Sequence, residues 1–208
     1  NAGDSISASN GIKNTLFGYN AGTAIANGDW NTAFGHDALT AVGNDSYNTA
    51  VGSNSLKLNT GSGNTAIGSK ALQTQVGAND NTAVGYNCLR DQTTASNNTA
   101  VGAFALAENE TGTNLVAIGN YALGSCNGGS SNVAIGREAM YSATSGGTNI
   151  AIGYYALYDT QTGSGNVAIG HLALQNSTSH GNIGIGVEAG NNLVDGERNV
   201  IIGQFAGD

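Results

Sequence analysis

The segment NTAIGSKAL (residues 64–72) decides how this chain folds, because close variants of it recur along the whole sequence. NTAVGYNCL follows at residues 81–89, and NIAIGYYAL at residues 149–157 has the same order of residue types. Each variant contains an Asn, a short apolar run, a glycine, and then a small residue followed by a large apolar one. Such self-similarity at a fixed spacing is typical of repeat proteins.

The glycine of this motif gives the period of the repeat. Successive copies lie 17 residues apart in nine intervals and 16 residues apart in the other two. The copies leave no room for a linker, so we treat residues 1–208 as a single repeat domain. The chain opens at Asn1 without an initiator Met, and we expect a processed or cut end and a segment of a longer protein. The motif glycines are Gly18, Gly35, Gly52, Gly68, Gly85, Gly102, Gly119, Gly136, Gly153, Gly170, Gly186 and Gly203.

The repeat predicts one short strand and one bend in every copy. In the run Thr-Ala-Val or Thr-Ala-Ile, alternate residues face opposite sides, so the outer two share one face and Ala occupies the other. The glycine permits a tight bend, after which we expect the Ala-Leu pair to begin a second short strand and a polar loop to close the coil. Seventeen residues cannot form a core alone, so neighbouring copies must stack in parallel. The sequence therefore predicts an all-β parallel β-solenoid, a β-roll or β-helix, of about twelve 17-residue coils.

A column of asparagines accompanies the strands. The fourth residue before the motif glycine is Asn in eleven of the twelve copies, and Leu115 is the exception. Identical amides stacked over one another can donate and accept hydrogen bonds along the stack, so we interpret this column as a structural ladder. Its central members are Asn31, Asn48, Asn64, Asn81, Asn98, Asn132, Asn149 and Asn166.

Composition excludes several classes of protein. There are 33 glycines and no proline, and only 10% of residues are charged, which argues against collagen and against a coiled coil. The net charge of −8 repels a phosphate backbone, so we expect no nucleic-acid partner. No apolar run approaches the roughly 18 residues of a membrane span, so we expect no membrane insertion.

Residue types that carry chemistry do not converge in the repeat. His36 and His171 share a repeat position, but at ~4.8 Å per coil they lie on the order of 40 Å apart, too far for a shared metal or a catalytic dyad. Glu138 and Glu188 are 50 residues apart, and Cys88 and Cys126 fit neither a zinc site nor a disulfide framework. We therefore predict no catalytic residue, no metal and no cofactor. A polysaccharide-cleaving tailspike is the least favoured alternative, because no interval offers an insertion that could build a cleft.

Aromatic residues near the motif glycine offer a candidate binding surface. Outward rings beside polar side chains could contact a glycan, although packing against neighbouring coils explains them equally well. The candidate glycan contacts are Tyr154, Tyr155, Tyr86, Tyr121 and Trp30.

The strand pattern also favours an oligomer. A single thin solenoid would expose one apolar strand face, whereas three copies sharing an axis could cover it, so we predict a homotrimer. An ice- or mineral-binding solenoid would instead need a solvent-facing Thr column. The strand position after Asn is Thr in six copies, from Thr15 to Thr99, but Val or Ile in the later ones, which favours an interior face.

The motif in residues 64–72 and 81–89 resembles the head repeats of YadA-like trimeric autotransporter adhesins, with a longer period here, and is similar to phage tail-fibre shafts. The resemblance implies a homotrimeric, left-handed parallel β-roll outside a cell, on a virion or on a bacterial surface. It implies a structural fibre or stalk segment that displays a receptor-binding surface, with a cell-surface glycan or host receptor as partner. The alternatives are a bacterial surface adhesin and a self-assembling extracellular filament.

Overall fold

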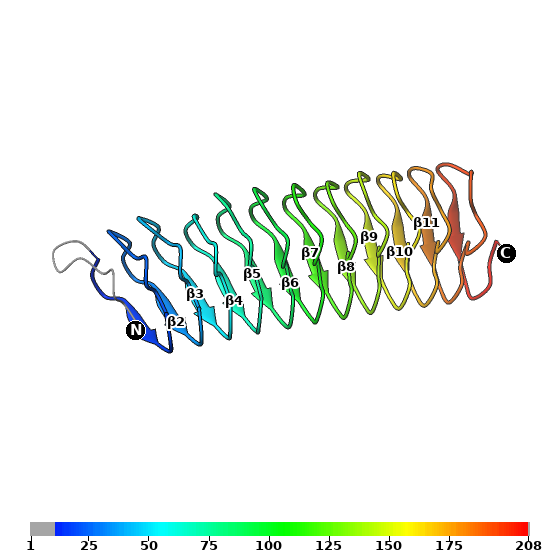
Figure 1. Cartoon of the computed structure of the whole chain (residues 1–208). Coiled ribbons are helices and arrows are strands. Elements are labelled where there is room, and N and C mark those ends of the chain that lie inside the picture. Colours follow the sequence, from blue (N-terminus) through cyan, green and yellow to red (C-terminus); the bar gives the residue numbers. More distant parts are fainter. Residues whose placement is uncertain (1–10, 208) are drawn as a thin grey trace.

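The protein is a straight rod of stacked coils (Figure 1), described for residues 11–207 by a computed structural model. Asn1, for which we expected a processed end, lies outside these residues. Twelve strands of three residues pair in chain order within one parallel sheet, which confirms the predicted parallel β-solenoid and its period. Each coil is numbered here by its strand. The strands are β1 (Thr15–Phe17), β2 (Thr32–Phe34), β3 (Thr49–Val51), β4 (Thr65–Ile67), β5 (Thr82–Val84), β6 (Thr99–Val101), β7 (Val116–Ile118), β8 (Val133–Ile135), β9 (Ile150–Ile152), β10 (Val167–Ile169), β11 (Ile183–Ile185) and β12 (Val200–Ile202).

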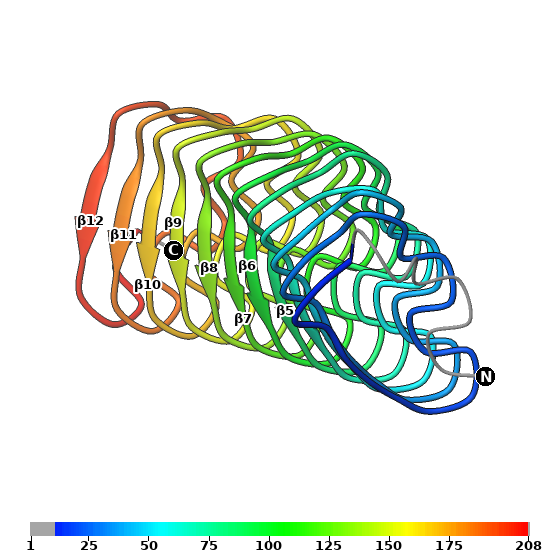
Figure 2. The same cartoon turned by 90° about the vertical axis from the view of Figure 1, so that its left-hand side faces the viewer.

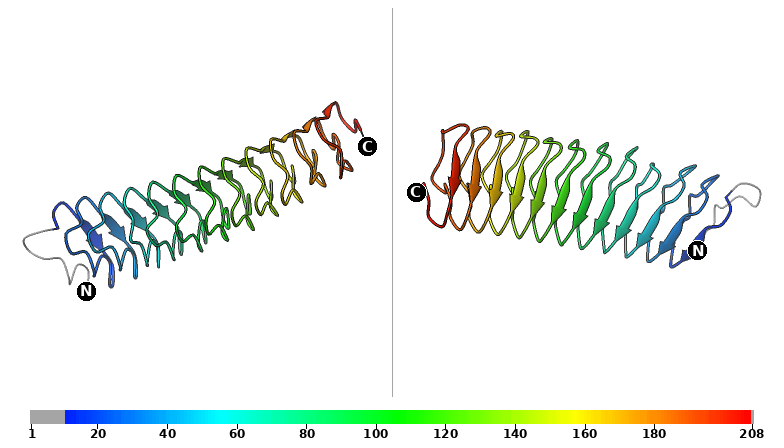
Figure 3. Two further views of the ribbon diagram at one scale, coloured as in Figure 1. Left: turned by 90° about the horizontal axis from the view of Figure 1, so that it is seen from above. Right: turned by 180° about the vertical axis from the view of Figure 1, so that it is seen from behind.

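Equivalent positions of the repeat lie directly over one another. Thr82 pairs with Thr99 and Ala83 with Ala100, and the same register continues along the sheet. The two 16-residue intervals keep this register, since Thr49 pairs with Thr65 across the first of them. The shortened coils therefore lose their residue outside the strands. Seen from the N-terminal end of the rod in Figure 2 and from above and behind in Figure 3, the strands form one continuous row along one side of the coils.

The motif glycine makes the bend after each strand and lets the coils approach closely. Gly119 has a φ of +136°, a conformation that side-chain-bearing residues rarely adopt. A Cβ atom placed on it would lie 2.4 Å from the carbonyl oxygen of Gly136 in the next coil. Both the backbone conformation and the coil spacing thus require glycine at this position.

The predicted second strand was wrong. The residues after the motif glycine form turns, and Leu89 has a φ of +50°, which is left-handed and incompatible with an extended strand. The amide of Leu89 nevertheless donates to the carbonyl of Ala105 in the next coil at 3.0 Å. Stacking therefore satisfies the backbone without a second sheet, because each left-handed turn lies over an identical turn.

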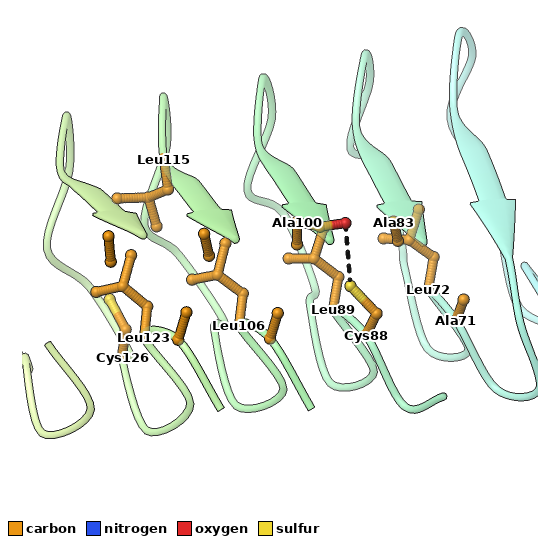
Figure 4. Close-up of a cluster of buried hydrophobic side chains, with 14 of the residues drawn as sticks. Ala71, Leu72, Ala83, Cys88, Leu89, Ala100, Leu106, Leu115, Leu123 and Cys126 are labelled. Atoms are coloured by element: carbon orange, nitrogen blue, oxygen red, sulfur yellow. Dashed lines mark hydrogen bonds between the residues drawn. The ribbon is translucent and has the colours of Figure 1, made fainter. Parts of the chain in front are cut away.

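The interior of the coils is narrow and apolar. The central residue of β2–β10 is an Ala that points inward and packs in the same core as the large apolar residue four positions after the motif glycine. Figure 4 shows Leu72, Leu89 and Leu106 in a row beside Ala83 and Ala100. The outer two strand residues point away from this core. They are not an interior face in the single chain, contrary to the expectation drawn from the change of Thr to Val and Ile.

Near both ends of the rod the core exchanges large and small residues. Gly22 replaces the usual Leu, and the side chain of Leu16, which replaces the usual Ala on β1, fills the space above it. Ile201 on β12 in the same way reaches over Gly190 and Gly207. In coils 1 and 12 the large side chain thus moves from the turn to the strand, which preserves the volume of the core. Coil 11 has glycine at both positions, Gly184 and Gly190, and Leu174 of the preceding coil packs against both.

The asparagine column links the coils through side chains and backbone. Asn81 accepts a hydrogen bond on its side-chain oxygen from the amide of Asn98 at 2.9 Å. Its side-chain nitrogen donates to the carbonyl of Ala95 at 3.0 Å and, more weakly, to Asn64 at 3.3 Å. Each side chain therefore satisfies backbone groups in two places, and side-chain to side-chain bonds are the minor part of the ladder.

Candidate functional site

The described residues hold no group of three or more His, Cys, Asp or Glu side chains that could bind a metal. His36 and His171 both lie on the surface, where each stacks on a tyrosine of the preceding coil, Tyr19 and Tyr154, with ring centroids 5.4 Å apart. Their role in the structure is ring packing.

Eight rings on coils 5 to 10 form a continuous aromatic ridge. Tyr121 stacks on Phe104 with centroids 4.7 Å apart and planes 1° apart, and Tyr141 stacks on Tyr158 at 5.5 Å. Tyr121 and Tyr141 join these two pairs at 6.1 Å. In order of contact, the aromatic ridge consists of Tyr86, Phe104, Tyr121, Tyr141, Tyr158, Tyr155, Tyr154 and His171.

The repeat positions its members in three columns, the first of which, one residue after the motif glycine, holds Tyr86, Tyr154 and His171. Phe104, Tyr121 and Tyr155 lie two residues after the motif glycine, where φ is positive, whereas Tyr141 and Tyr158 lie five residues after it. Because equivalent positions stack from coil to coil, rings in one column meet face to face. Sequence reasoning missed Tyr141 and Tyr158, although their shared repeat position in consecutive coils was the signal that could have found them.

Four of the five candidate glycan contacts belong to this ridge. Tyr154 and Tyr155 touch each other with centroids 4.1 Å apart, and Tyr86 and Tyr121 flank Phe104. Trp30 lies apart from them in coil 2, where the ammonium of Lys13 lies 4.0 Å from its ring centroid. The structure thus brings Tyr86, Tyr121, Tyr154 and Tyr155 onto one ridge and leaves Trp30 outside it.

A shallow, open pocket of about 230 Å³ lies within the ridge. Its lining consists of the rings of Tyr121, Tyr141 and Tyr158 and the carboxylate of Glu138. Gly124 leaves room for Tyr141, since a Cβ atom there would lie 2.9 Å from that ring. The pocket therefore combines aromatic surface with one acidic acceptor.

The electrostatic environment of the pocket is negative. The Glu138 side chain is 14% exposed and accepts a hydrogen bond from Arg137 at 3.0 Å. Burial, together with the charges of Glu138 and Asp159, raises the pKa of Tyr158. Hydrogen bonds with Tyr154 and Glu138 raise the pKa of Tyr155. The pocket thus favours neutral phenols and offers a carboxylate to a donor or a cation.

A second surface, the strand face, consists of the outward residues of β1–β12. Large apolar side chains are exposed along much of its length. No helix long and apolar enough to span a bilayer occurs among residues 11–207. The strand face is therefore an apolar surface that a partner could cover. Its most exposed apolar members are Phe17, Phe34, Ile67, Val101, Ile118, Ile150, Ile152, Ile169, Val200 and Ile202.

Comparison with known proteins assigns this chain to no family. No family model, no curated protein and no solved structure matches it. The candidate functional surfaces of the chain are therefore the ridge, the pocket and the strand face.

The two cysteines lie in the core and are free. Burial raises the pKa of the Cys88 thiol to about 12 and that of Cys126 to about 11. We expect neither thiol of the folded protein to react with dithionitrobenzoate at pH 8, and both to react in guanidinium, because only the thiolate attacks. Colorimetric titration measures this. A stoichiometric reaction of the folded protein would show that one of these coils opens.

Proposed function

We propose that the protein is a structural segment of an extracellular fibre, of the phage tail-fibre or adhesin type, which assembles as a homotrimer and presents a receptor-binding surface. The observation that carries the proposal is the strand face. Twelve parallel strands in one uninterrupted sheet present apolar side chains outward along the rod. Soluble monomers rarely expose apolar patches beyond a few hundred Å², and covering this one with further copies removes it from water.

The regular stack supports a fibre role. Each coil contacts its neighbours through the same hydrogen bonds, so the rod is stiff and its length follows from the number of coils. Such a rod suits a stalk that holds a binding surface away from a virion or a cell. The aromatic ridge is the proposed receptor-binding surface, because half-buried tyrosines beside a carboxylate can stack on and hydrogen-bond a surface polymer.

The first test is the mass of the particle in solution. We expect light scattering to give three times the 20.7 kDa chain, stable to dilution. Lysines introduced on the strand face by Ile118→Lys and Ile152→Lys should give single chains, because a covered charge is strongly disfavoured. Asn120→Lys, at an exposed position outside the strands, is the matched control and should keep the trimer. If the natural protein has the mass of a single chain, the trimer is overturned. A very large mass without a fixed number of chains would favour a self-assembling filament instead.

The outward Thr column supports a second candidate, an ice- or mineral-binding surface. The threonines of β1–β6 face away from the core and are half-buried or exposed, as on Thr65 and Thr99. Their spacing follows the strand spacing of ~4.8 Å, so the hydroxyls form a regular row. The test is thermal hysteresis, the gap between the melting and freezing points of ice in a solution of the protein. A single-chain protein that shows this gap, and a Thr65→Leu variant that does not, would favour this candidate over the fibre.

A further inference from the structure

Two of the three tyrosine rings that line the pocket meet edge to face. Tyr121 and Tyr141 have centroids 6.1 Å apart and planes inclined by 64°. The rings thus form a corner rather than a flat platform. A cation interacts with a π-system within ~6 Å of a ring centroid, so a compact cation in the pocket lies within reach of these rings.

Each of these two rings stacks on a ring of a neighbouring coil. Phe104 stacks on Tyr121, and Tyr158, which also lines the pocket, stacks on Tyr141, with planes 1° and 10° apart. The sheet holds these coils in register. The corner is therefore formed before any ligand arrives, which lowers the entropy lost on binding.

The charge at the pocket is acidic. Glu138 lines it with a largely buried carboxylate, whereas its partner Arg137 has a side chain that is 61% exposed and does not line the pocket. Between residues 91 and 197, Arg137 is the only Lys or Arg in the sequence. The pocket therefore offers an acidic ligand a repelling carboxylate, and residues 91–197 offer it no unpaired guanidinium or ammonium.

We propose that this pocket binds an organic ammonium group carried by the surface that the fibre grips. The tyrosine rings that line the pocket attract the cation, and the Glu138 carboxylate balances its charge. The group could belong to a quaternary ammonium substituent or to an unacetylated amino sugar, which share this chemistry. The inference rests on the proposed role as a surface-binding fibre and specifies the ligand of the aromatic ridge.

The test compares choline with its uncharged isostere, 3,3-dimethylbutan-1-ol, by calorimetric or NMR titration of the natural protein. We expect choline to bind saturably and the isostere to bind about tenfold more weakly or worse, because only the charge differs. Glucosamine and N-acetylglucosamine form the second arm. Preference for glucosamine over choline would identify an amino sugar as the source, and the reverse a quaternary ammonium.

Variants at the pocket separate the contributions. Glu138→Gln should weaken choline about tenfold, and Tyr141→Leu should abolish saturable binding, whereas Tyr141→Phe should keep it because the π-face remains. Arg137→Ala should strengthen binding, since it frees the carboxylate of Glu138, an effect that a purely structural role would not produce. Tyr19→Leu is the control, because Tyr19 stacks on His36 far from the pocket.

Three results would overturn the proposal: equal binding of choline and its isostere, no binding of any ammonium probe, or choline binding that Glu138→Gln and Tyr141→Leu leave unchanged. Circular dichroism of each variant shows whether it folds. The mass of the same samples tests the fibre independently. If the protein is a trimer but binds no ammonium probe, only the proposed ligand is overturned. If it is a single chain that binds choline, only the proposed trimer is overturned.

Discussion

Gly119→Ala should destabilise the rod by about 4 kcal/mol or more. The added Cβ atom would lie 2.4 Å from the carbonyl oxygen of Gly136 and 2.6 Å from its carbon, which are backbone atoms that cannot rotate away. The φ of +136° is strained for any side-chain-bearing residue as well. To relieve the contact, coil 7 must separate from coil 8 and lose sheet hydrogen bonds such as that from Gly136 to Ile118 at 2.8 Å.

Gly165→Ala is the matched control for this effect. Gly165 also has a positive φ, +69°, but a Cβ atom there would meet nothing within 4 Å. We expect a loss of roughly 1–2 kcal/mol, the cost of the left-handed conformation alone. Urea unfolding followed by circular dichroism measures both variants, and hydrogen exchange should locate the damage in coils 7 and 8. Equal losses for the two would mean that close coil packing does not limit this position.

The repeat made the register of the sheet predictable. A motif that returns after 17 residues stacks each residue on its equivalent, and the observed pairs Thr82 with Thr99 and Ala83 with Ala100 follow from that alone. The conformation after the glycine did not follow. Leucine ordinarily avoids the left-handed region, so the φ of +50° at Leu89 is imposed by packing of its side chain against the Ala column and by coil-to-coil hydrogen bonds.

The aromatic ridge was predictable only in part. Tyr154 and Tyr155 follow a motif glycine, and the motif directed attention to them. Tyr141 and Tyr158 lie in a column that other coils fill with Thr, Lys, Gln, Arg, Ala, Gly or Asn, so no single residue type marks it. Whether rings in one column meet depends on which consecutive coils carry them. The burial of Cys126 escaped prediction for the same reason, because its column varies from Ile25 to Gln75.

The strand face and the ridge are separable by mutation. The strand face uses the residues just before the motif glycine, and the ridge uses residues from the first to the fifth position after it. We therefore expect a lysine at Ile118 to disrupt the proposed trimer without touching the rings, and Tyr141→Leu to alter the pocket without touching the sheet. This separation lets assembly and ligand binding be tested as independent properties.

Asn149→Leu should cost about 2–5 kcal/mol, because it removes both ends of one step of the asparagine ladder. The side-chain oxygen of Asn149 accepts from the amide of Asn166 at 2.8 Å, and its nitrogen donates to the carbonyl of Gly163 at 2.8 Å. Asn149 and Asn166 are buried, so water cannot replace the lost partners. Leu115 shows that the column can accommodate one leucine sterically, and its own amide still donates to Asn98.

Asn120→Leu is the control, since Asn120 is exposed and its hydrogen bond to the carbonyl of Ala103 can be replaced by water. We expect it to change the free energy of unfolding by less than about 0.5 kcal/mol.

Asn149→Asp tests the direction in which stability changes with pH. It keeps the acceptor for Asn166, but burial raises the pKa of the introduced carboxyl, so this variant should regain stability as the pH falls below that pKa and lose it as the pH rises. Urea unfolding at several pH values measures this. A leucine variant as stable as the control would show that the ladder contributes register but little free energy.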